Sequence, residues 1–137
     1  MLLNIPLLLA PFAVYNLFAM RIVGPAGGDP WVTPIFTVNM VSDARWTMTL
    51  GDMMITAGLV LLFVEVLKAT RSNMGSIFDH LLSTLLFIVF LIEFLLVAEA
   101  ATSVFFILMI ISLIDVIAGF SITIRTARRD MTIGHTG

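Results

Sequence analysis

The chain has 137 residues, of which 60% are hydrophobic and 12% charged, and its formal net charge is −2. A soluble domain carries about 25% charged residues, so this composition indicates an integral membrane protein, with room for three or four spans in one domain. The small negative charge and the lack of a basic stripe argue against nucleic-acid binding. The sequence contains no cysteine, which excludes disulfides, thiolate metal sites and iron–sulfur clusters.

The first of four predicted transmembrane helices covers residues 2–20, which are strongly apolar. Pro6 suits the first turn of such a helix, whereas Pro11 lies inside it and is expected to kink it. Residues 21–45 contain Gly24-Pro25, Gly27-Gly28 and Asp29-Pro30 pairs, which are typical of turns. A connection of this length is usually functional or interfacial, so we predict a loop folded onto the outer membrane surface.

Within this loop, a short interfacial helix is expected over residues 36–41. Trp31 and Trp46 are expected to anchor the loop, because indole rings favour the headgroup region. Ser42 or Asp43 is the expected cap of the second span, which covers residues 46–68 and is followed by an inner loop over residues 69–77.

Residues 79–125 form an almost unbroken apolar run with no proline. As a single helix it would be about 70 Å long, roughly twice the thickness of the hydrocarbon layer, so it must fold back on itself. We predict a tight hairpin of two spans, 78–98 and 103–125, with Thr102 or Ser103 capping the second. A mobile tail, 126–137, follows, and the fold class is all-α.

The basic residues indicate an orientation. With four spans, both termini and the inner loop lie on one side of the membrane, together with most of the basic residues: Lys68, Arg71, Arg125, Arg128 and Arg129. Only Arg21 and Arg45 lie on the other side. The positive-inside rule therefore places both termini in the cytoplasm, in a multi-pass protein of the cell inner membrane, with those five basic residues and the two tryptophans as interface anchors.

Three acidic residues fall inside predicted spans. Asp115 lies about 18 Å along the fourth helix, near the midplane, with Ser112 on the same face. Glu93 lies in the outer half of the third helix. Asp52 is predicted about two turns into the second helix, on one stripe with Thr56.

None of these acids has a lysine or arginine at its depth in the chain. A fourth acid, Glu65, differs from these three, because it is expected to pair with Lys68 while both side chains reach toward the inner interface. An isolated carboxylate in lipid is costly, so three resolutions stand open. The acid is protonated, it meets a positive group on another subunit, or it binds a cation or lines a water-filled path.

The sequence shows no catalytic motif, metal-ligand cluster or phosphate-binding loop. We therefore predict a non-enzymatic membrane subunit or scaffold, without a cofactor or metal, that packs into a homo-oligomer or larger complex within the lipid bilayer. Its intramembrane acids and small-residue faces would make the contacts. The alternative is a small proton- or cation-coupled transporter that uses Asp115, Glu93 and Asp52. Binding of a pigment or quinone is left open.

Overall fold

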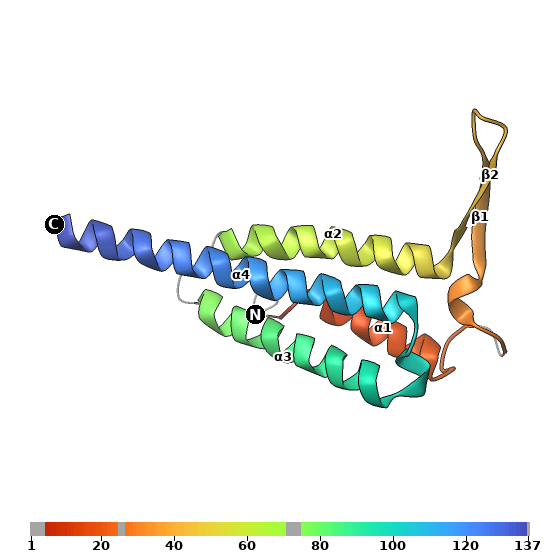
Figure 1. Cartoon of the computed structure of the whole chain (residues 1–137), viewed down its shortest axis with the longest axis horizontal. Helices are drawn as coiled ribbons and strands as arrows, with labels where there is room; N and C mark the ends of the chain where they lie inside the picture. Colours follow the sequence, from red (N-terminus) through yellow and green to blue (C-terminus); the bar gives the residue numbers. More distant parts are fainter. Residues whose placement is uncertain (1–4, 25–26, 71–74, 137) are drawn as a thin grey trace.

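The computed structural model describes residues 5–24, 27–70 and 75–136. Helices dominate the described chain: α1 (Leu9–Ala19), α2 (Leu50–Thr70), α3 (Gly75–Leu96) and α4 (Ser103–Thr136). They lie side by side along the long axis of the molecule, as Figure 1 shows. Three stretches are long and apolar enough to cross a membrane: Leu50–Thr70, Ile77–Leu96 and Ser103–Ile122. The protein is therefore mostly helical, with three helices of spanning character and one shorter apolar helix.

Helix α1 is shorter than the predicted first span. It has 11 residues, which corresponds to about 16 Å against the roughly 30 Å of a hydrocarbon core. It begins at Leu9, so Pro11 falls in its first turn, where the missing N–H deprives the helix of no hydrogen bond. The kink expected at Pro11 is thus avoided by a later start of the helix.

The connection after α1 contains a β-hairpin, so the expectation of an interfacial helix over 36–41 was wrong, and the predicted all-α fold holds only in that the chain is mostly helical. Strands β1 (Pro34–Asn39) and β2 (Arg45–Thr49) pair antiparallel. Apolar and polar residues alternate from Phe36 to Asn39 in β1 and along the whole of β2, which is the period of a strand. Asp43 adopts a positive φ of 69° in the turn between them, a conformation that Asp tolerates better than most residues.

Helix α2 begins at Leu50, later than predicted, and its cap is Thr49 in place of Ser42 or Asp43. The Thr49 N–H donates to Asp52 Oδ2 at 3.1 Å, and the Asp52 N–H donates to Thr49 Oγ1 at 3.2 Å. This reciprocal pair has the form of a capping box, in which two otherwise unpaired amides of the first turn are satisfied.

The predicted hairpin between α3 and α4 is confirmed. A short 3-10 turn, η3 (Ala98–Ala100), links the two helices, and Thr102 Oγ1 accepts the Phe105 N–H at 3.2 Å as the N-cap of α4. The tail, in contrast, continues α4 as a helix to Thr136. Residues 126–136 include no proline, and their only glycine is Gly134, so nothing in the sequence stops the helix at residue 125.

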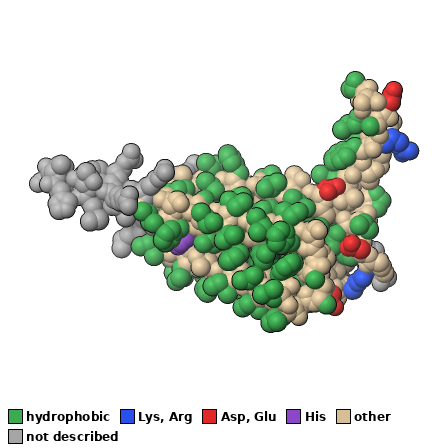
Figure 2. All heavy atoms as spheres, viewed as in Figure 1, with side chains coloured by type: hydrophobic (Ala, Val, Ile, Leu, Met, Phe, Trp, Pro, Cys, Tyr) green, Lys and Arg blue, Asp and Glu red, His purple; other side chains and the backbone are tan. Residues whose placement is uncertain are grey.

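Helix α4 lies at the centre, in contact with α2 on one side and α3 on the other. Small residues allow the close approach of α2 and α4, since a Cβ added at Gly58 would lie 2.9 Å from Leu108 Cδ2. The visible face of the helices is covered by apolar side chains, whereas charged side chains gather at the hairpin end, where the hairpin leaves the helices (Figure 2). This distribution is the one expected of helices surrounded by lipid.

Candidate functional site

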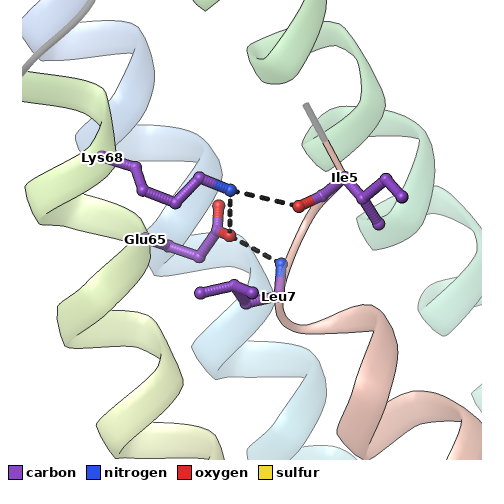
Figure 3. A network of polar contacts seen from close by, with 4 residues as sticks. All are labelled: Ile5, Leu7, Glu65 and Lys68. Carbon is purple, nitrogen blue, oxygen red and sulfur yellow. Dashed lines mark hydrogen bonds and ion pairs between the residues drawn. The ribbon is translucent and has the colours of Figure 1, made fainter. Parts of the chain in front are cut away.

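A buried ion pair on α2 holds the chain segment that precedes α1. Lys68 Nζ lies 3.1 Å from Glu65 Oε1, and the Glu65 side chain is 2% exposed. The same carboxylate oxygen accepts the Leu7 N–H at 2.6 Å, while Lys68 Nζ donates to the Ile5 carbonyl at 3.1 Å. Figure 3 shows both side chains turned toward this segment.

The chemical need for this arrangement comes from Pro6. Residues 5–7 precede the first turn of α1 and are not helical, so some of their backbone groups lack intrahelical partners. Such groups must be satisfied by protein where water is excluded. The pairing of Glu65 with Lys68 was predicted, but not its direction: the two side chains point into the bundle. The backbone groups that the pair binds, the Leu7 N–H and the Ile5 carbonyl, were not predicted. Pro6 was the available signal, because a proline at the start of an apolar helix leaves nearby backbone groups without helical partners.

Asp115 is enclosed by the protein, with 6% of its surface exposed. Its carboxyl group faces Ser83 of α3 and lies within electrostatic range of Glu65, Asp79 and Lys68. Among the described residues, Lys68 acts on Asp115 only electrostatically, because its ion pair is with Glu65.

Two more polar side chains complete this inner cluster, which we define as Glu65, Lys68, Asp79, His80, Ser83 and Asp115. Asp79 Oδ1 and His80 Nδ1 are buried without a hydrogen-bond partner among the described residues. The His80 ring also contacts Phe120, with 5.5 Å between ring centroids. The cluster thus joins three helices through groups that can exchange protons.

Small residues near Asp115 pack inside the chain. Ser112 is 1% exposed, and a Cβ added at Gly119 would lie 3.3 Å from His80 Nδ1. Small residues such as these allow another helix to approach closely, and at Gly119 the approaching helix is α3 of the same chain.

Glu93 lies away from the inner cluster, toward the hairpin end of the helices. It is half-buried and faces Asn16 of α1, and its Oε2 is buried with no hydrogen-bond partner in the described part of the chain. The sequence requires a second helix to serve Glu93. Helix α1 of the same chain is the helix that reaches it.

Tyr15 organises the hairpin end of the bundle. It is fully buried, its hydroxyl donates to the Glu99 carbonyl at 2.9 Å, and it shares a 2.6 Å hydrogen bond with Thr102 Oγ1. Its ring stacks on Trp31 with centroids 4.5 Å apart. Trp31 is therefore a core residue, packed inside the chain, and its predicted role as an interface anchor stays a prediction. Trp46, on the hairpin, is exposed.

Asp52 and Thr56 are not brought together with the other acids. Asp52 is exposed in the first turn of α2, because the helix starts later than predicted, and Thr56 Oγ1 donates to the Asp52 carbonyl at 2.8 Å. An open cavity of about 490 Å³ beside Asp52 is lined by residues of three segments: Asp29, Trp31, Val32, Thr49, Gly51, Asp52, Ile55, Ala101, Thr102, Ser103 and Val104.

An aromatic layer separates Glu93 from the inner cluster. Phe90 lies 4.8 Å from Phe12 and 5.2 Å from Phe105, measured between ring centroids. Phe90 and Phe105 are at most 1% exposed. Packed apolar rings therefore lie between Glu93 and Ser83 of the inner cluster along α3.

The remaining predicted anchors are less defined. Arg71 lies outside the described residues. Arg125, Arg128 and Arg129 are on the far part of α4, where the backbone is described and the side chains are not. Within residues 5–24, 27–70 and 75–136, no three metal-ligating side chains come together. Comparison with family models, curated proteins and solved structures finds no match, so function is inferred from the chain's own residues.

Proposed function

We propose that the protein is a non-enzymatic integral membrane subunit, which binds another copy or a different protein through the extension of α4. The observation that carries this proposal is the length of α4. Its apolar part is Ser103–Ile122, but the helix continues to Thr136. The added residues 123–136 extend it by about 21 Å, well beyond the ends of α2 and α3 (Figure 1).

Where α4 runs past the described ends of α2 and α3, it does not pack on those two helices (Figure 1). Most helix stability in proteins comes from packing, and an isolated helix of about 14 residues is marginal in water. The extension carries Arg125, Arg128, Arg129 and Asp130, which suit an aqueous contact surface. A partner chain packed against it would supply the missing stabilisation.

The buried acids support a different contact surface from the one expected. Asp115 faces Ser83 of its own chain, and a buried acid that has a partner within the chain does not require another subunit. Glu93 faces Asn16, but its Oε2 has no hydrogen-bond partner among the described residues. The proposal therefore places subunit contacts outside the membrane-spanning core.

The proposed location is the inner membrane, with the α4 extension and the N-terminus in the cytoplasm. The support for this orientation is the sequence position of five basic residues. Lys68 and Arg71 lie near or directly after the end of α2, and Arg125, Arg128 and Arg129 lie on the α4 extension. Because successive spans cross in opposite directions, all five fall on the same side of the membrane, which the positive-inside rule assigns to the cytoplasm.

Native mass spectrometry of the chain released from membranes tests the subunit proposal. We expect a particle heavier than the 15.1 kDa monomer, and a monomer when the chain is ended after Ile124. A matched variant with Arg125, Arg128 and Arg129 replaced by Gln keeps the helix length and separates the contribution of charge. A full-length chain found only as a monomer from membranes contradicts the proposal.

A second candidate, a small proton-coupled transporter, has support from the inner cluster. Glu65, Asp79, His80 and Asp115 come from three helices, and Glu65 and Asp79 lie within electrostatic range of Asp115; titratable groups inside a membrane domain are typical of proton relays. The aromatic layer of Phe12, Phe90 and Phe105 opposes it, because packed apolar rings lie between this cluster and Glu93 along α3. Asp52, at the far end, would be the third acid of such a route.

A further inference from the structure

The β-hairpin has one apolar and one polar face. Cross-strand partners share a face of a two-stranded sheet, and neighbours along a strand lie on opposite faces. The register therefore collects one set of partners on an apolar face: Phe36 with Met48, and Val38 with Trp46. The opposite, polar face holds the other partners: Thr37 with Thr47, and Asn39 with Arg45.

Side-chain contacts agree with this assignment. Phe36 and Trp46 meet edge to face, with ring centroids 5.8 Å apart. On the polar face, the Thr37 and Thr47 hydroxyls share a hydrogen bond of 2.9 Å. Each face is thus internally connected, and the hairpin is amphipathic.

No other part of the described chain covers the apolar face. Phe36 is 43% exposed, and Val38 and Trp46 are each 41% exposed. A two-stranded hairpin is at best marginally stable in water, and needs something to pack against. An apolar face left open in this way indicates a partner surface.

The direction of the hairpin identifies that surface. The hairpin leaves the end of α2 and runs across the direction of the helices (Figure 1). Because α2 is long and apolar enough to cross a membrane, a segment perpendicular to its end runs along the membrane surface. Figure 2 shows apolar side chains on the side of the hairpin that faces back along the helices, with charged side chains at the tip and on the other side.

We infer that the hairpin is an interfacial anchor, lying in the headgroup layer with its apolar face toward the acyl chains of the bilayer that the helices cross. Trp46 would sit at the level where indole rings are favoured. Asp43 and Arg45 are the only charged residues between Pro34 and Thr49, and they balance. Binding therefore depends on apolar area and not on anionic lipid. This inference goes beyond the proposed function and holds with or without a partner chain.

The absence of cysteine in the native sequence permits a matched test with a single label. Val38→Cys and Asn39→Cys place an environment-sensitive NBD dye at adjacent positions on opposite faces. Each full-length chain is reconstituted at one copy per phosphatidylcholine nanodisc, with and without lipids brominated on their acyl chains. We expect blue-shifted NBD emission, quenched by the brominated lipid, for the label at position 38 and water-like, unquenched emission at position 39. Added phosphatidylglycerol leaves both signals unchanged.

Three outcomes overturn the inference. Water-like emission at both positions places the hairpin in solvent. Equal shielding at both positions shows that the faces are not distinguished by lipid. Shielding at position 38 that requires several chains per nanodisc identifies a second copy as the cover. Trp46 provides a check without a dye. In an unlabelled Trp31→Phe chain, Trp46 is the one remaining tryptophan. Its quenching by brominated lipid would show that the hairpin contacts acyl chains when no label is attached.

Discussion

Removing Lys68 tests whether the ion pair on α2 determines how the N-terminal segment packs. Glu65 is 2% exposed in the native chain, and in Lys68→Met it would keep only the Leu7 N–H as a hydrogen-bond donor among the contacts observed. Breaking one side of a buried ion pair leaves an uncompensated charge, which costs about 3–5 kcal/mol. Lys68 itself is 13% exposed, so some water reaches the pair. We therefore expect the free energy of unfolding to fall by about 3 kcal/mol.

The double variant Glu65→Leu/Lys68→Met sharpens this expectation. It removes both charges together and leaves only the Leu7 N–H and the Ile5 carbonyl without their partners. An unsatisfied buried group costs about 1–3 kcal/mol. The double variant is thus expected to lose less stability than the sum of the two single variants, with a coupling energy of about 0.5–3 kcal/mol, as for other residues in contact.

The free energies are measured by reversible unfolding in mixed micelles with increasing dodecyl sulfate, followed by far-ultraviolet circular dichroism. Glu99→Gln is the matched control, since Glu99 has an exposed carboxylate and we expect a change below about 0.5 kcal/mol. Hydrogen exchange at Leu7 gives the local response and should quicken in Glu65→Leu. Single variants that each cost less than about 1 kcal/mol and add without coupling would refute a buried pair, since solvated pairs behave that way.

Two further predictions concern the helix contact and the inner cluster. Gly58→Val should lower the free energy of unfolding by about 1–3 kcal/mol through overpacking against Leu108. The control Gly27→Ala should leave that free energy nearly unchanged, because nothing lies within 4 Å of the added Cβ. Equal effects of the two substitutions would contradict the close contact of α2 and α4. In proteoliposomes under a pH gradient, we expect proton flux no higher than in protein-free vesicles for the native chain and for Asp115→Asn. Native flux that Asp115→Asn abolishes without changing the native mass would favour the transporter.

Local sequence signals predicted the hairpin of α3 and α4. Residues 79–125 are too apolar to leave lipid and too long to cross once, so the turn had to fall at the polar residues near Glu99. Thr102 then capped the following helix, as an N-cap residue does through amides only three residues away. The turn and the cap both depend on residues that are close together along the chain, so composition and spacing were sufficient to predict them.

Local signals were misleading between Ala19 and Leu50. The alternation that forms β1 and β2 is present in the sequence, but their turn around Asp43 has no Asn-Gly or Asp-Gly pair to announce a hairpin. Residues 36–41 are also a short apolar run, which periodicity alone does not assign to helix or strand. Pairing with a second strand resolved that ambiguity, and such pairing is a property of two segments together.

The residues alone predicted long apolar helices that carry acids, and three helices of the structure are long and apolar enough to cross a membrane, because the hydrophobicity of a segment depends on its composition. The tertiary structure determined which groups serve those acids: Lys68 turns inward to Glu65, Ser83 meets Asp115, and Asn16 meets Glu93. Each of these contacts joins charges or dipoles whose meeting depends on how helices rotate and approach. Spacing along a single helix places a side chain on a face, but packing selects what that face touches.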